Sequence, residues 1–185
     1  MISESLEISP DLLLEKIQDA NIILRLNYYP KGTPEGGIWA GEHTDIDLFT
    51  ILPSSKGAGL QVQEKNGKWI DVIVPSGSYI VNCGDMLQNL TNGHYRSAVH
   101  RVVEKGENKD RYSIVYFVHP RPECSVSPLP LAIEKTGGIQ RYPNAIEQEL
   151  FSVRMMNLGI ASEEMVQYAK DSGILDRLDE LGLTF

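Results

Sequence analysis

The sequence has little of several features that mark whole classes of protein. It contains two cysteines, Cys83 and Cys124, which are too far apart for the C-x-x-C spacing of a zinc or dithiol redox motif. Acidic side chains outnumber basic ones by 25 to 17, and this net charge of −8 argues against nucleic acid or an anionic membrane surface as partner. No apolar run approaches the roughly 20 residues that cross a bilayer, and the polar start MISESLEISP does not resemble a signal peptide. We therefore expect a cytoplasmic protein with free thiols.

The sequence does contain many short apolar stretches that are separated by turn signals. Asn66-Gly67, a strong hairpin signal, lies between two of them. The stretches that predict strands are 22–30, 43–52, 58–65, 68–74, 77–83, 94–104 and 110–120. Short strands at this spacing, with few helices between them, indicate a mainly β (α+β) fold of the sandwich, jelly-roll or barrel type.

Helical patterns flank these strands. A capped helix is expected within 9–21, and the segment 121–143, rich in Pro and Gly, is expected to run extended over the surface. Three helices are expected at 144–159, 162–173 and 174–183. The last carries an apolar stripe of Ile174, Leu175, Leu178 and Leu181. We interpret the stripe as packed into the core, with a dimer contact or a lid over an active site as the alternative.

The stretch GEHTDIDLFTIL contains a candidate pair of metal ligands. In a strand, alternate side chains point the same way, so His43 and Asp45 would share a face. They would supply two ligands of the 2-His-1-carboxylate triad that holds non-haem Fe(II). Of the three remaining histidines, His100 is favoured as the third ligand because it lies within a predicted strand, and His94 is second. The alternative is that the His-x-Asp pair is an ordinary polar strand end.

A second pair could bind a carboxylate. Arg111 and Ser113 share one face of a predicted strand, and a guanidinium with a hydroxyl beside it suits such a group. Tyr28 or Tyr29 could add a phenol to the same carboxylate. Taken alone, the pair could equally be a surface arginine with a small neighbour.

Taken together, these stretches resemble the isopenicillin N synthase-like family of Fe(II)/2-oxoglutarate oxygenases. The resemblance runs from about residue 20 to 157. It rests on LRLNYYP, HTD followed by FTIL, GLQV with GKWIDV, VNCGDMLQNLTNGHYRSAVHRV, RYSIVYF and RYPNAIEQELF. The implied fold is a double-stranded β-helix, a distorted jelly roll, with flanking N- and C-terminal helices.

The resemblance also implies roles for individual residues. The implied Fe(II) ligands are His43, Asp45 and His100, and the implied 2-oxoglutarate residues are Arg111, Ser113, Tyr29 and, nearby, Asn27. Leu60 and Phe117 are candidates for lining a substrate pocket, with plain jelly-roll core as the alternative.

The implied activity is that of a dioxygenase that hydroxylates or desaturates a small molecule and releases succinate and CO2. The cofactors and cosubstrates would be Fe(II), 2-oxoglutarate and O2, with ascorbate as a stimulant. Two alternatives stay open at this point: an oxidase of the isopenicillin N synthase type that does not use 2-oxoglutarate, and a truncated, non-catalytic metal-binding jelly roll.

One departure from the family concerns organisation. Family members usually carry well over a hundred residues before the Tyr-Pro strand, whereas one helix is expected here. We therefore expect a domain fragment, a truncated product or a shortened enzyme. The expected division is an N-terminal helix (1–21), the oxygenase core (22–120), an extended segment with the family-like tail helix (121–161) and extra C-terminal helices (162–185). Those extra helices are expected to cover an exposed face or to join two chains as a homodimer.

Overall fold

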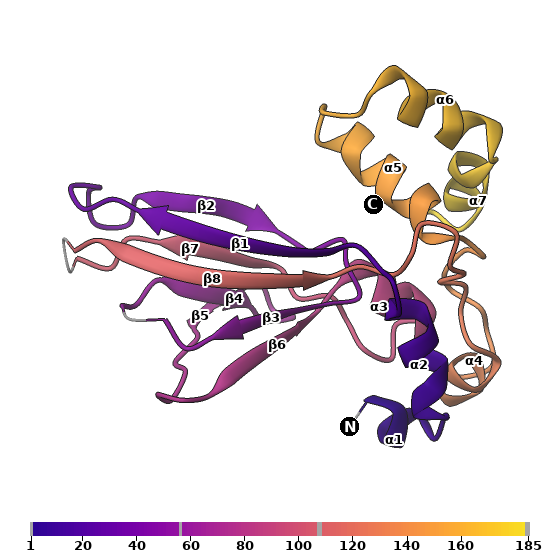
Figure 1. Ribbon diagram of the computed structural model, residues 1–185, viewed down its shortest axis with the longest axis horizontal. Helices are drawn as coiled ribbons and strands as arrows, with labels where there is room; N and C mark the ends of the chain where they lie inside the picture. The colour runs from indigo at the N-terminus through magenta and orange to yellow at the C-terminus, as the bar shows by residue number, and fades with distance from the viewer. Residues whose placement is uncertain (1, 56, 107–108, 184–185) are drawn as a thin grey trace.

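The chain forms two antiparallel four-stranded sheets, arranged as two layers with the helices gathered at one end (Figure 1). The computed structural model describes residues 2–55, 57–106 and 109–183. One sheet has the order β1 (Ile22–Tyr29), β8 (Arg111–Val118), β3 (Phe49–Pro53), β6 (Tyr79–Cys83). The other has the order β2 (Ile38–His43), β7 (His100–Val103), β4 (Leu60–Gln63), β5 (Trp69–Asp71).

Successive strands alternate between the two sheets at every step except one. The exception is the hairpin of β4 and β5, whose turn contains Asn66 and Gly67, with Gly67 at a φ of +84°. This alternation is the topology of a double-stranded β-helix, so the expected fold class is confirmed. The strand expected at 43–52 begins only at Phe49, because His43 ends β2 and a turn separates the two strands.

The sheet that contains β1 and β8 carries polar as well as apolar side chains on its inward face and is apolar on its outward face. Inward positions carry Arg25, Asn27, Arg111 and Ser113, whereas their outward neighbours are large and apolar. The exposed residues of this outer face are Ile22, Leu24, Leu26, Tyr28, Tyr79, Val81, Tyr112 and Ile114. A sheet usually turns its apolar face to the core, so this arrangement leaves a broad apolar surface in contact with solvent.

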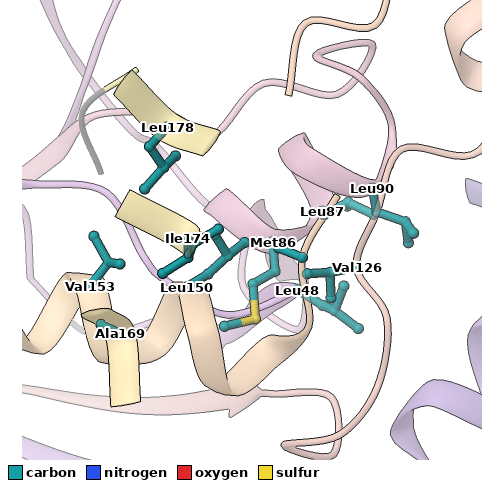
Figure 2. Close-up of a cluster of buried hydrophobic side chains, with 11 residues drawn as sticks. Leu48, Met86, Leu87, Leu90, Val126, Leu150, Val153, Ala169, Ile174 and Leu178 are labelled. Carbon is teal, nitrogen blue, oxygen red and sulfur yellow. The ribbon is translucent and has the colours of Figure 1, made fainter. Parts of the chain in front are cut away.

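The main apolar core lies beside the sheets and is built by helices. It joins α3 (Asp85–Leu90) to α5 (Glu147–Asn157), α6 (Glu163–Asp171) and α7 (Ile174–Glu180). Figure 2 shows Met86 of α3 among Leu48, Leu150 and Ile174. Most of the expected stripe is packed into this core, since Ile174 and Leu178 are buried and Leu175 is partly buried, but Leu181 follows the end of α7 and is exposed.

The N-terminal and connecting segments differ in some respects from the sequence prediction. Ser9 caps α2 (Pro10–Ile17) as expected, but α1 (Ile2–Leu6) and α3 were not predicted. The expectation of an extended surface path throughout 121–143 is wrong at two places. The segment contains α4 (Pro130–Lys135), and Val126 is fully buried, with its carbonyl bonded to the Asn89 side chain. No helix among the described residues has the length and apolarity needed to cross a membrane.

The role of the C-terminal helices in stability can be tested with a matched pair of substitutions. Ile174 is 0% exposed and Ile160 is 67% exposed. Ile174→Ala should lower the free energy of unfolding by about 2–5 kcal/mol, because it leaves a cavity in the core. Ile160→Ala should change it by less than about 0.5 kcal/mol. Urea denaturation followed by circular dichroism measures both, and equal small effects would show that α7 is dispensable for the core.

Candidate metal centre

A turn between β2 and β3 presents the first two candidate ligands. His43 is the last residue of β2, and Asp45 lies two residues further on, outside any strand. The expected strand alternation therefore does not bring them together. Instead the turn is fastened by backbone hydrogen bonds, from Asp85 N to Asp45 O (2.8 Å) and from Met86 N to Asp47 O (3.1 Å). The start of α3 thus fixes the position of Asp45.

His100 completes a group of three. It is the first residue of β7 and pairs with His43 in the antiparallel register, so it lies at a strand end and not in mid-strand as expected. The Nε2 atoms of His43 and His100 each lie 3.8 Å from Asp45 Oδ1. The three ligand atoms lie within 4.8 Å of one another, a spacing suited to one shared metal ion. His94 is exposed in the preceding turn and is not a member of this group.

Hydrogen bonds on the far side of each imidazole orient it for a metal. Nδ1 of His43 lies 2.7 Å from the Gly41 carbonyl, and Nδ1 of His100 lies 3.1 Å from the Ala98 carbonyl. An N–H at each Nδ1 satisfies these contacts and leaves the Nε2 lone pair facing Asp45. Burial also lowers the pKa of His43, which favours the neutral imidazole that a metal requires.

One oxygen of Asp45 is held by the protein, and the other is left for a metal. Oδ2 accepts hydrogen bonds from Thr50 Oγ1 (2.7 Å) and Asn82 Nδ2 (2.8 Å). Oδ1 is the atom that faces the two histidines. Nearby, burial and the charge of Asp45 raise the pKa of Asp47 to about 7, so Asp47 adds less than a full negative charge beside the group near neutral pH.

Arg111 is a buried cation with free hydrogen-bond donors. Its side chain lies beside the Tyr29 ring, with the guanidinium carbon 5.0 Å from the ring centroid, and Nη2 donates to Ser55 Oγ at 3.1 Å. Nε and Nη1 have no hydrogen-bond partner among the described residues, and no acidic group there forms an ion pair with Arg111. Burial lowers the pKa of Arg111, as expected for a cation removed from water. An anionic ligand would satisfy these donors.

Ser113 and Asn27 lie beside Arg111 on the same sheet face. Asn27 Nδ2 donates to Ser113 Oγ at 3.3 Å, across the register that pairs the two residues. This contact leaves the Ser113 hydroxyl hydrogen available to a ligand. The strand spacing therefore does place a hydroxyl next to the free guanidinium donors, as the sequence predicts.

One cavity of about 480 Å³ joins these groups. The sequence-predicted residues that line it are His43, Asp45, His100, Arg111, Ser113, Tyr29, Asn27, Leu60 and Phe117. These nine residues are thus brought to one space between the two sheets, whereas the alternatives Tyr28 and His94 do not line it. The cavity places the candidate metal ligands near a buried arginine with free donors, which would allow one small molecule to contact both.

Sequence reasoning missed the residues that position the ligands. Thr50 and Asn82 hold Asp45, and Arg154 of α5 donates to Thr44 Oγ1 at 2.7 Å within the ligand turn. A signal existed for two of them, because Thr50 and Asn82 are polar residues inside the apolar strands FTIL and YIVNC. Arg154 gave no such signal, since a polar residue on a helix is ordinary.

Comparison with known proteins identifies similar chains. The family model described as the 2OG-Fe(II) oxygenase superfamily matches residues 20–120. A gibberellin 2-beta-dioxygenase 3 from Arabidopsis thaliana is 38% identical over 141 residues, which cover 73% of this chain and 42% of the relative. A feruloyl CoA ortho-hydroxylase from Ipomoea batatas is 35% identical over 149 residues, which cover 80% of this chain and 41% of the relative. The chain therefore spans less than half the length of these curated relatives.

A solved structure is similar over a larger share of the chain. A full-length Neurospora crassa protein, crystallised in complex with alpha-KG, superimposes with a TM-score of 0.76 and 30% identity, covering 84% of this chain and 50% of that one. The double-stranded β-helix described above is thus shared with a protein whose structure contains the keto acid.

The ligand assignment predicts different outcomes for two histidines. His100→Ala should abolish Fe(II) binding, because two remaining ligands do not make a facial site. His94→Ala should leave the affinity unchanged within a few-fold, because this histidine is exposed and outside the group. Iron retained after anaerobic gel filtration, measured by mass spectrometry, provides the readout. Loss of iron from the His94 variant alone would contradict the assignment.

Proposed function

The chain belongs to the 2OG-Fe(II) oxygenase superfamily, and from that membership we propose that it is an Fe(II)- and 2-oxoglutarate-dependent dioxygenase. It hydroxylates or desaturates a small molecule with release of succinate and CO2. The observation that carries the proposal is the shared cavity, which joins the His-Asp-His group to a buried arginine with free donors.

The residues present fit iron in this proposal. His43 and His100 each offer an Nε2 lone pair, and Asp45 offers one oxygen while Thr50 and Asn82 hold the other. Two neutral imidazoles and one carboxylate on one side of an ion leave its other positions open to small ligands, which is the donor set of non-haem Fe(II) oxygenases. The exposed edge of His43 gives access to the group from solvent.

The residues also fit 2-oxoglutarate. Arg111 would bind its distal carboxylate through the two donors that lack a partner, and Ser113 would donate a further hydrogen bond. Tyr29 packs against the guanidinium, and Asn27 orients the Ser113 hydroxyl. When iron, 2-oxoglutarate and O2 are bound, the centre supplies the oxidising power to convert a substrate C–H bond.

The remaining cavity wall holds the organic substrate near the metal. Leu60 and Phe117 line this wall, and we assign them to substrate contact, since apolar side chains exclude water from the reacting groups. The names of the relatives, a gibberellin dioxygenase and a feruloyl CoA hydroxylase, support a small-molecule substrate for this chain too. We propose ascorbate as a stimulant on the same family grounds.

An anaerobic titration tests the proposed function. Addition of Fe(II) and then 2-oxoglutarate should produce a weak visible charge-transfer band that needs both additions, and succinate should form when O2 is admitted. Arg111→Gln should weaken 2-oxoglutarate binding by about 2–4 kcal/mol, the value of a charge-assisted bidentate contact. Arg141→Gln, at an exposed arginine that does not line the cavity, is the control.

The outcomes separate the alternatives. Bound iron without a band or succinate would favour an oxidase that does not use 2-oxoglutarate, or a non-catalytic metal-binding protein. Unchanged 2-oxoglutarate affinity in the Arg111 variant would refute the role of this residue. The matched Arg141 variant removes the same charge from the surface, so it controls for a general effect of net charge on anion binding.

We further infer the organisation and location of the protein. We propose four segments: an N-terminal segment (1–21), the oxygenase core (22–120), the linking segment with its tail helix (121–161), and the C-terminal helices (162–185). The last strand ends at Val118, which supports the second of these boundaries. A cytoplasmic location is supported by the free thiols of Cys83 and Cys124.

We also propose that the chain forms a homodimer. The C-terminal helices are less well supported as the interface, because their apolar residues Ala169, Ile174 and Leu178 are buried within their own chain. The outer face of the β1-β8-β3-β6 sheet is better supported. Its exposed apolar side chains cover on the order of 800 Å², about the area that one partner buries in a standard interface. The outward positions of β1 and β8 carry no charge, so two copies could pack face to face without repulsion.

Two pairs of substitutions distinguish the two interfaces. Leu24→Glu with Leu26→Glu places charges on the outer sheet face, where both leucines are exposed, and should convert the dimer to monomer. Ile160→Glu with Leu181→Glu places the same charges in the loop before α6 and just after α7, and should leave the dimer intact. Light scattering coupled to gel filtration reports the mass. The opposite pattern would favour the C-terminal helices, and a monomeric unmodified chain would exclude both interfaces.

A further inference from the structure

A second cavity, of about 350 Å³, lies on the other side of the candidate metal ligands. His43, Asp45, Arg25 and Phe117 line both cavities, whereas Arg111 and Ser113 line only the first. The second cavity is bounded by β1, the ligand turn, the end of β8 and α5. The candidate iron would therefore stand between two compartments, one with the proposed 2-oxoglutarate residues and one without them.

The second cavity is mostly apolar. Six apolar side chains line it: Ile23, Ile46, Phe117, Phe151, Met155 and Leu158. Such walls favour a hydrocarbon skeleton over a sugar or a nucleotide. The volume falls at the lower end of the range of about 300–1,000 Å³ for small-molecule sites, so the ligand is small.

Three basic side chains besides His43 also line the cavity, and two of them are paired. Arg154 forms an ion pair with Asp85, and His119 lies 3.7 Å from Glu147. Arg25 is the third, and no hydrogen bond or ion pair involves its side chain within the stretches of the chain that the structure describes. Among the described residues, Arg25 is therefore the one lining cation without an acidic partner.

Phe117 holds Arg25 at the cavity. The Arg25 guanidinium carbon lies 4.6 Å from the centroid of the Phe117 ring, in a cation–π contact. The ring covers one face of the guanidinium and leaves its edge donors free, which is the geometry that grips a carboxylate with two hydrogen bonds.

Arg25 and Arg111 lie too far apart to bind one carboxylate. Arg111 pairs with Tyr29 in the β1–β8 register, and Arg25 is four residues from Tyr29 on the same inward face. Four residues of strand span about 13 Å. Arg111 therefore lies at one end of the β1–β8 ladder, and Arg25 lies near its middle.

We propose that the substrate extends from the metal group into the second cavity, and that this substrate is a small carboxylic acid with an apolar skeleton whose carboxylate binds Arg25. The inference rests on the proposed dioxygenase function and adds to it the class of substrate. The apolar body lies against Phe151, Met155 and Leu158, and this places its carbon atoms next to the face of the metal group shared by both cavities.

The test compares an acid with its neutral counterpart. The probes are 4-phenylbutyrate and 4-phenylbutanamide, which have the same skeleton and differ in charge. Each is titrated anaerobically into the full chain loaded with Fe(II) and saturating 2-oxoglutarate, and the change in the charge-transfer band is followed. The acid should bind at least tenfold more tightly than the amide. Saturating 2-oxoglutarate keeps the probes away from Arg111.

Three variants assign the difference to Arg25. Arg25→Gln should remove the preference for the acid, and Arg25→Lys should keep some of it because the charge remains. Arg101→Gln is the matched control, since Arg101 also lies over an aromatic ring, Trp69 at 4.1 Å, but lines neither cavity. This control should retain the full preference.

The outcomes distinguish the inference from the function on which it rests. Three outcomes, each with the charge-transfer band intact, would overturn the inference. The acid and the amide bind with equal affinity, neither probe binds, or the preference for the acid survives Arg25→Gln. Absence of the band in the unmodified chain would instead refute the proposed 2-oxoglutarate site. A band that is retained in Arg25→Gln, with the acid preference lost, supports both.

Discussion

The sheet that contains β1 and β8 has its polar residues on the inside, and much of the molecule follows from this constraint. Arg25, Asn27, Arg111 and Ser113 share the inward face, where a jelly roll would ordinarily pack aliphatic side chains. Polar groups between two sheets cannot collapse into a dry core without losing hydrogen bonds. The space between the sheets therefore stays open as a cavity of about 480 Å³.

The apolar core is displaced as a result, and its new position serves the metal group. The core joins Leu48, at the end of the ligand turn, to Met86 of α3 and to the C-terminal helices (Figure 2). The backbone of Asp85 and Met86 at the start of α3 donates hydrogen bonds to Asp45 and Asp47 in that turn. Packing of α3 against α5 and α7 therefore holds the turn rigidly, and rigid ligands bind a metal with less loss of conformational entropy.

The sequence predicted the contents of the site better than the geometry that holds them. Strand alternation correctly brings Arg111 and Ser113 together, because both lie in one regular strand. The same argument expects His43 and Asp45 to lie together, and they do, but a turn and not strand alternation brings them there, since the strand ends at His43. Turn conformation depends on distant partners such as Asp85, and a single sequence does not reveal those. Likewise the buried path of Val126 depends on Asn89, a contact between segments far apart in the chain.

The two arginines of the β1–β8 ladder differ in ways that suit two different ligands. Arg111 is 5% exposed, and its free donors are cut off from water, so an anion there gains strength from a low local dielectric. Arg25 is exposed and is held by an aromatic face, so solvent weakens what it can contribute. A cosubstrate common to every turnover would suit the stronger site. A substrate that must enter and leave as product would suit the weaker one, because tight binding at that position would slow release without helping the reacting carbon. The inward face of one strand pair can thus carry two anion sites whose strengths differ with the burial and the surroundings of each arginine.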